Sequence, residues 1–239
     1  MPLWKVPCLL AVWGSYMVVS TPPPVAAPPE TQRPYEELSW AAKLLQKRDA
    51  GRMIVNSLVT YVMFAEAAFT TGIAGYGPID EAPNSDKNMR SRDRSNANTV
   101  SPVFLAGVMC SLLGGILRYW SYEAMGRHFT FQLSILEEHQ LITDGPYAYV
   151  RHPGYTALIL TFFGISACEL SPGSWWIEAH IFDSICGKFM GLLGICAVLQ
   201  LVMVVSRAPA EDRALREKFG SRWDEWARRV PYRYIPGVC

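Results

Sequence analysis

Two apolar stretches near the C-terminus decide the fold: PGYTALILTFFGISACEL at residues 153–170 and GKFMGLLGICAVLQLVMVV at residues 187–205. A helix that spans a membrane needs about 20 mostly apolar residues, and both stretches approach that length. Windows of similar character occur at Leu9–Ser20, Met53–Thr71 and Pro102–Leu117. So many windows in one chain of 239 residues do not suit the core of a soluble domain. We therefore predict an all-α fold, a polytopic membrane protein with about five transmembrane helices.

Composition excludes several other classes of protein. Hydrophobic residues make up 50% of the chain and charged residues 18%, and 22 Lys and Arg against 21 Asp and Glu leave a net charge of +1. Nucleic-acid binding needs a concentrated positive field, which this balance does not provide, and a disordered chain would be far more polar. The six cysteines show no C-x-x-C spacing and four lie in apolar runs, so we interpret them as buried hydrophobes.

The first apolar window has two interpretations. Lys5 precedes it and the small residues Val25, Ala26 and Ala27 follow it, as in a cleaved signal peptide. We favour a retained helix, because further spans follow and no disulfide framework does.

Basic residues predict the orientation, since Lys and Arg concentrate on the cytosolic side of membrane proteins. The loop Ser171–Cys186 contains neither residue type. The segment after Val205 contains eight of them: Arg207, Arg213, Arg216, Lys218, Arg222, Arg228, Arg229 and Arg233. We therefore expect a cytosolic C-terminal tail, a lumenal loop and a helical hairpin over residues 153–205, with the segment from Arg118 to His152 also cytosolic.

The cytosolic segment before the hairpin carries unusual residues, HQLITDGPYAYVRHPGY at residues 139–155. Pro153 is predicted to occupy the first position of a helix, so Arg151 and His152 lie where free backbone amides attract an anion. Taken alone, an Arg-His pair beside a membrane is more often an anchor to lipid headgroups.

The segment after the hairpin carries a second set. Arg207 and Glu211 are four residues apart and share a face if this turn is helical, although a bare surface pair contributes at most about 1 kcal/mol. Ser221–Asp224 has the pattern of a capping box. Trp223, Trp226 and Val230 then form the apolar stripe of an amphipathic helix, which lies on the bilayer surface or folds over a pocket.

Together these motifs resemble the isoprenylcysteine carboxyl methyltransferase family of the endoplasmic reticulum, part of a wider group with phospholipid N-methyltransferases. The matching features are GRHFTFQ at residues 126–132, H-x-L-I-T-x-G-P-Y, R-H-P-x-Y, and the ending F-G-x-x-W-x-x-W-x-x-R-V-P-Y-x-x-I-P-G-V. The resemblance covers Gly126 to Val238. It implies that the hairpin, the cytosolic loops and the amphipathic C-terminal helix form a site for the cofactor S-adenosylmethionine.

Carried over by motif, the cofactor-binding positions are Gln132, His139, Gln140, Leu141, Ile142, Tyr147, His152, Pro153, Gly154, Tyr155 and Glu211. The resemblance also implies that Arg207 contacts the substrate carboxylate, which makes it the predicted catalytic and substrate-binding residue. One departure is that Asp212 follows Glu211 where the family usually has a second Glu.

The function that the resemblance implies is methyl transfer to the C-terminal carboxylate of a prenylated cysteine. Such a carboxyl group has a pKa near 3.5 and is already ionised, so no general base is needed. A prenyl chain partitions into the bilayer at about 0.8 kcal/mol per methylene. The expected partners are prenylated CaaX-type proteins or small prenylcysteine lipids, and membrane lipid, with no nucleic acid and no metal. The expected location is the endoplasmic reticulum membrane, with the active site and C-terminus facing the cytosol.

Three alternatives stay open. A phospholipid amine N-methyltransferase would need a base, for which His139 or Asp212 could be nominated. A sterol-type membrane reductase also carries R-H-P-x-Y and a V-P-Y ending, and a catalytically silent scaffold could keep the fold.

The predicted organisation has four regions. Residues 1–20 form a first membrane helix or signal-like segment, and residues 21–51 a Pro-rich linker with an interfacial helix. Residues 52–120 form two membrane helices with a polar loop at 78–100. Residues 121–239 form the methyltransferase core, with the membrane hairpin at 153–205 and the cytosolic tail.

Overall fold

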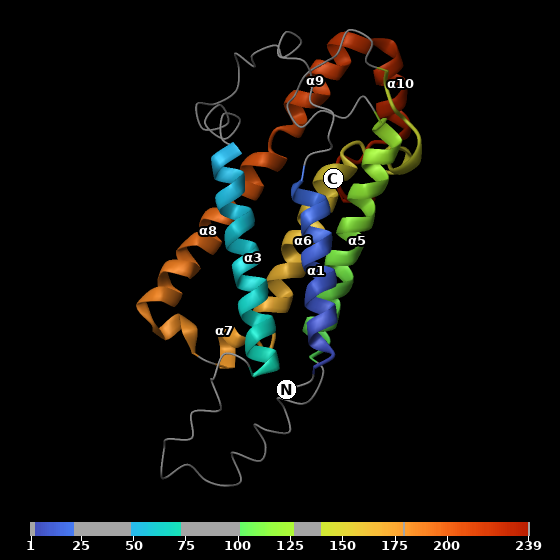
Figure 1. Ribbon diagram of the computed structural model, residues 1–239. Helices are drawn as coiled ribbons and strands as arrows, with labels where there is room; N and C mark the ends of the chain where they lie inside the picture. Colours follow the sequence, from blue (N-terminus) through green and yellow to red (C-terminus); the bar gives the residue numbers. More distant parts are fainter. Residues whose placement is uncertain (1–2, 22–48, 73–100, 127–139, 179, 239) are drawn as a thin grey trace, which may run out of the picture.

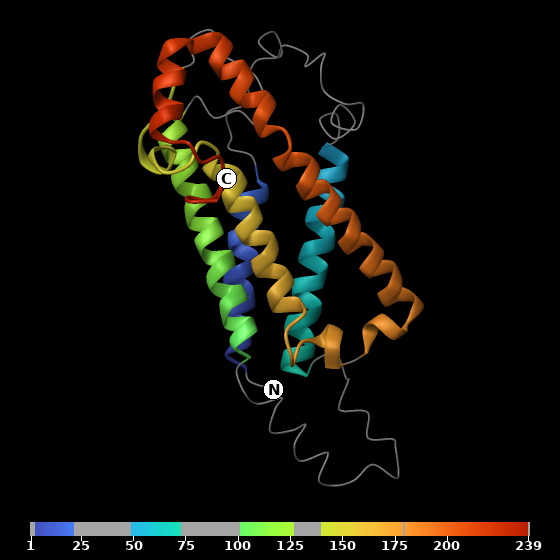
Figure 2. The ribbon, with the colours of Figure 1, turned by 180° about the vertical axis from the view of Figure 1, so that it is seen from behind.

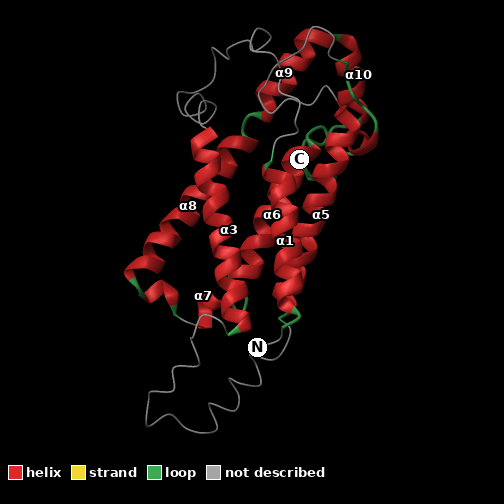
Figure 3. Ribbon diagram, in the orientation of Figure 1, coloured by secondary structure: helices red, strands yellow, loops and turns green. Residues whose placement is uncertain are grey.

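A computed structural model describes residues 3–21, 49–72, 101–126, 140–178 and 180–238, and within these ranges all regular secondary structure is helical (Figure 3). Side chains are described from residue 55 onward in the second range. The predicted interfacial helix, most of the Pro-rich linker and the polar loop at 78–100 lie outside these ranges. The all-α class predicted from the sequence is therefore confirmed for the described part of the chain.

Each predicted apolar window is a helix. The five helices are α1 (Lys5–Ser20), α3 (Asp49–Thr71), α5 (Pro102–Met125), α6 (Pro153–Glu169) and α8 (Ile185–Val205). Helix α5 continues past its predicted end at Leu117. Among the described residues, Pro102–Met125 and Ile185–Phe219 are long and apolar enough to cross a membrane. These two spans fit a helical membrane protein, and the total of about five spans stays a prediction.

Helices α1, α3, α5 and α6 lie side by side and enclose the apolar core (Figures 1 and 2). Leu9, Val12, Met63, Phe104 and Cys168 are buried together at its centre. The buried ammonium of Lys5 donates a hydrogen bond to the Gly173 carbonyl at 2.9 Å, which ties α1 to the loop after α6. Helix α1 is thus part of the core of the described chain, and its retention in the mature protein stays a prediction.

Helices α5 and α6 approach each other closely through small residues. A Cβ atom on Gly164 would lie 2.6 Å from the Ser111 backbone nitrogen and 2.7 Å from the Gly107 carbonyl oxygen. Such small residues let two helix backbones come into contact, as they do in membrane helix pairs. This contact fixes α6, whose N-terminal end carries the candidate site.

The predicted hairpin is formed by α6 and α8, which run in opposite directions, with α7 (Trp175–Glu178) and η4 (Ile181–Asp183) between them. Helix α8 leans away from α6 (Figures 1 and 2). Gly187 is its one buried residue, and side chains such as Phe189, Ile195 and Val202 are exposed. An apolar helix of this kind is suited to contact with lipid.

Two short helices follow α8, namely α9 (Ala208–Phe219) and α10 (Ser221–Arg229). The predicted apolar stripe is confirmed, because Trp223, Trp226 and Val230 pack in one buried cluster with Tyr147. The predicted capping box is wrong. Gly220 occupies the cap position with φ of 54°, and no side chain caps the helix. Ser221 is already the first helical residue, one position too late to act as a cap.

Candidate functional site

The chain after α10 runs back along the start of α6, and we call residues 230–235 the C-terminal strap. The Arg151 backbone N–H donates to the Tyr232 carbonyl at 2.9 Å, and the His152 N–H donates to the Arg233 carbonyl at 2.9 Å. The Thr156 hydroxyl donates to the Tyr234 carbonyl at 2.7 Å. The strap therefore fixes the backbone from which the His152 side chain projects.

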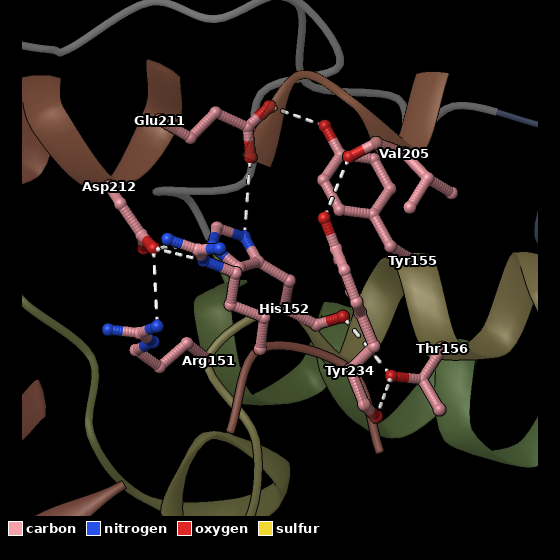
Figure 4. A network of polar contacts seen from close by, with 9 residues as sticks. Arg151, His152, Tyr155, Thr156, Val205, Glu211, Asp212 and Tyr234 are labelled. Carbon is pink, nitrogen blue, oxygen red and sulfur yellow. Dashed lines mark hydrogen bonds and ion pairs between the residues drawn. The ribbon is translucent and has the colours of Figure 1, made fainter. Parts of the chain in front are cut away.

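His152 lies between two carboxylates from α9 (Figure 4). Its Nε2 is 2.9 Å from Asp212 Oδ1 and its Nδ1 is 3.4 Å from Glu211 Oε2. The next residue, Pro153, keeps His152 out of the helical conformation, and its φ of −128° and ψ of 63° agree with this. The imidazole is thereby directed across the gap between the start of α6 and the first turns of α9.

The mutual contacts set the charges of this group. Burial lowers the pKa of His152, but the hydrogen bonds and charges of Asp212 and Glu211 raise it more, so it lies above the ordinary 6.5. Burial raises the pKa of Glu211, whereas His152, Tyr155 and Arg207 together lower it below its usual range. The pKa of Asp212 is also lowered, by His152, Arg151 and Arg233 against the effect of burial. These contacts thus favour the protonated form of His152 and the anionic forms of Glu211 and Asp212.

Tyr155 and Arg207 complete the surroundings of Glu211. The Tyr155 hydroxyl donates a hydrogen bond to Glu211 Oε1 (Figure 4). Arg207 precedes Glu211 by one helical turn, because the Glu211 N–H donates to the Arg207 carbonyl at 3.1 Å. Arg207 Nε is buried and has no hydrogen-bond partner within the described ranges. A half-buried guanidinium with an unused donor is suited to an anionic ligand, since a carboxylate can accept its hydrogen bonds.

The structure brings some of the predicted site residues together and not others. His152, Tyr155, Arg207 and Glu211 form one group, and Pro153 and Gly154 begin the helix beneath it. Leu141, Ile142 and Tyr147 instead lie in or against the cluster of α10 tryptophans, where the Tyr147 carbonyl accepts from Trp226 Nε1 at 3.2 Å. Gln140 is exposed. Gln132 and His139 lie outside the described residues. The cofactor role of each position stays a prediction.

Arg118 of α5 is a residue at this site that motif reasoning missed. It is 5% exposed, its Nε donates to the Tyr122 hydroxyl at 2.8 Å, and a Cβ on Gly154 would lie 2.5 Å from its guanidinium. The sequence did contain a signal, because an ionisable residue within an apolar stretch is rare and is usually functional.

Arg151 and Arg233 were also missed as partners of Asp212, which they contact at 3.4 and 3.1 Å. Within the described ranges no group of three His, Cys, Asp or Glu side chains is arranged to hold a metal ion.

Comparison with known proteins supports the motif interpretation. Residues 107–217 match the model of the isoprenylcysteine carboxyl methyltransferase family, which confirms the resemblance predicted from the sequence. The match begins within α5, earlier than the motifs indicated, and stops before α10.

Two curated relatives carry the name of this family, and a third is a sterol reductase. Protein-S-isoprenylcysteine O-methyltransferase B of Arabidopsis thaliana is 30% identical over 127 residues, 52% of this chain and 55% of that protein. A probable protein-S-isoprenylcysteine O-methyltransferase of Oryza sativa subsp. indica is 26% identical over 130 residues, 54% of this chain and 59% of that protein. A delta(14)-sterol reductase of Mus musculus is 31% identical over 100 residues, 41% of this chain and 20% of that protein. The chain thus spans little more than half the length of the two methyltransferases. No solved structure matches it.

Proposed function

We propose that this chain transfers a methyl group from S-adenosylmethionine to the C-terminal carboxylate of a prenylated cysteine, giving a methyl ester. Support comes from the family match over residues 107–217 and from relatives named as isoprenylcysteine O-methyltransferases. The structural observation that carries the proposal is the half-buried Arg207, whose buried Nε has no hydrogen-bond partner among the described residues and which lies one helical turn before the anionic Glu211. A carboxylate substrate would supply the missing acceptor.

The residues around His152 suit the cofactor. When bound, S-adenosylmethionine supplies a methyl group on a positively charged sulfonium. Glu211 is a carboxylate whose lowered pKa keeps it anionic at neutral pH, so it can balance positive charge on the cofactor. Tyr155 and His152 hold that carboxylate in place through hydrogen bonds, and the C-terminal strap holds His152.

Arg207 and the surrounding apolar helices suit the substrate. A guanidinium binds a carboxylate through two parallel hydrogen bonds and so fixes its orientation. Methyl transfer to an ionised carboxylate needs orientation and the exclusion of water rather than proton removal. The exposed apolar side chains of α8 provide a lipid-facing surface next to α9, on which Arg207 and Glu211 lie.

The membrane setting belongs to the same proposal. We propose about five spans, a location in the endoplasmic reticulum, and a site and C-terminal tail that face the cytosol. The prenyl chain would then lie in the bilayer while its carboxylate reaches the interface. Prenylated proteins and small prenylcysteine lipids are both candidate substrates.

A transfer assay tests the reaction and the role of Arg207 together. Membranes containing the chain are supplied with labelled S-adenosylmethionine and N-acetyl-S-farnesylcysteine, and base-labile methyl ester is counted. We expect ester formation, a large loss in Arg207→Ala with cofactor affinity kept, and no change in Arg222→Ala, an exposed arginine of α10. Full turnover by Arg207→Ala would show that the assigned role is wrong.

Phosphatidylethanolamine in a parallel reaction tests the amine alternative. An amine acceptor must lose a proton, which requires a base. Of the two nominated bases, Asp212 is disfavoured because its cationic partners lower its pKa and so make it a weaker base, and His139 lies outside the described residues. Label in the phospholipid would therefore overturn the proposed acceptor.

The reductase alternative has its own support, since the mouse sterol reductase is 31% identical over 100 residues. Binding of S-adenosylmethionine by the purified chain separates the two, because a sterol reductase or a silent scaffold has no use for that cofactor.

A further inference from the structure

A cavity opens between α9, α10 and the strap, beside the His152 group. Its volume is about 230 Å³. Asp212 belongs to both this cavity and the His152 group, whereas Arg207 and Glu211 do not line it. The residues that line it are Arg151, Pro209, Asp212, Arg213, Arg216, Trp223 and Arg233.

Positive charge exceeds negative charge around this cavity. Four guanidinium groups line it, and the described carboxylates that contact them are Asp212 and Asp224. Asp212 is shared among His152, Arg151 and Arg233, and Asp224 contacts Arg216 at 2.8 Å at the surface. The cavity therefore keeps an excess of about two positive charges, which a dianion would neutralise.

Two buried hydrogen-bond donors in the cavity wall have no acceptor. Arg151 Nε and Trp223 Nε1 are buried without a hydrogen-bond partner within the described ranges, and Trp223 is 8% exposed. The Arg151 guanidinium carbon lies 5.6 Å from the centre of the Trp223 ring, so the two side chains are neighbours. Buried donors almost always have acceptors in folded proteins, and their presence here indicates a ligand rich in acceptor oxygens.

We propose that this cavity is a binding site for a phosphate group, carried by an anionic membrane lipid or present as free phosphate. A phosphate monoester carries a charge of about −1.5 to −2 and three acceptor oxygens, which agrees with the excess charge and the unused donors. Arginine forks bind phosphate through paired hydrogen bonds. The site adjoins the proposed methyl-transfer site through Asp212, but its occupation by phosphate does not depend on that activity.

Binding of inorganic phosphate to the purified full chain tests the site. The chain is placed in nanodiscs of pure phosphatidylcholine, and phosphorus NMR measures phosphate affinity at constant ionic strength. The test variant is Arg213→Gln/Arg216→Gln, and the charge-matched control is Arg222→Gln/Arg229→Gln on α10. All four arginines are exposed, so the folds should be kept, which circular dichroism checks.

We expect saturable binding that falls roughly tenfold or more in the test variant and less than about twofold in the control. Equal losses of phosphate affinity in both variants would overturn the site, because they would indicate that the overall positive charge attracts phosphate without a specific site. No binding, or displacement of phosphate by S-adenosylmethionine, would also overturn it as a separate phosphate site. An adventitious ion only, bound without saturation, would have the same consequence.

A second set of nanodiscs that contain phosphatidic acid identifies the source of the phosphate. Loss of inorganic phosphate binding in these discs supports a lipid headgroup as the occupant. Unchanged binding supports free phosphate.

Discussion

Asp212→Asn tests whether the shared carboxylate holds the site together. The Asp212 side chain is 7% exposed and contacts His152 at 2.9 Å, Arg233 at 3.1 Å and Arg151 at 3.4 Å. The substitution keeps the shape and one acceptor oxygen but removes the charge. It would leave the buried His152 ring and the Arg151 guanidinium without their shared anion.

The expected loss of stability follows from this burial. Removing one partner of a buried ion pair costs about 3–5 kcal/mol. Because asparagine keeps an acceptor and Arg233 is half-exposed, we expect the lower end, about 3 kcal/mol. For a chain of this size that corresponds to a fall in Tm of roughly 6–12 °C.

Thermal unfolding of the purified chain, followed by circular dichroism, measures this effect. Asp224→Asn is the matched control, since it removes a carboxylate from an arginine pair whose side chains are 63% and 42% exposed. An exposed pair contributes less than about 1 kcal/mol, so this Tm should change little. Equal Tm values for the two variants would refute the reasoning that Asp212 organises a buried charged group.

Three further predictions concern charge and packing. The raised pKa of His152 means that its stabilising contribution is complete below pH 6.5 and is lost as the pH rises through the pKa of the folded state. The free energy of unfolding should therefore decline over that pH range. The variant His152→Gln should lack this decline. Glu211→Gln should weaken S-adenosylmethionine binding, measured by calorimetry, by roughly tenfold or more, and unchanged affinity would contradict its assigned role. Gly164→Ala should destabilise the α5–α6 contact by about 1–3 kcal/mol in chemical unfolding. The control Gly194→Ala, whose added Cβ meets nothing within 4 Å, should be neutral or slightly stabilising.

The sequence predicted the helices well because apolar periodicity and length are local properties. All five windows are helices, and the stripe of Trp223, Trp226 and Val230 is buried as expected. The ends of the helices were predicted less accurately. Arg118 and Tyr122 looked like the start of a cytosolic segment, yet hydrogen bonding and burial carry α5 to Met125.

The candidate site was predicted in part, through motifs that mark positions but not partners. His152, Tyr155, Arg207 and Glu211 come together as the motifs indicate. The bridging of Asp212 by Arg151 and Arg233 could not be predicted, because it depends on the strap returning to α6. The buried position of Arg118 likewise depends on the close approach of α5 to Gly154.

The strap has a consequence for how the protein is made. The carbonyl of Tyr234 accepts a hydrogen bond from the Thr156 hydroxyl, and the ribosome adds Tyr234 to the chain 78 residues after Thr156. Until then the backbone N–H groups of Arg151 and His152 lack the acceptors that position the imidazole. The helices can enter the bilayer one after another, but His152 is held only once the strap has been translated. We therefore expect a chain interrupted before the strap to form the helices without holding His152 in its position in the site.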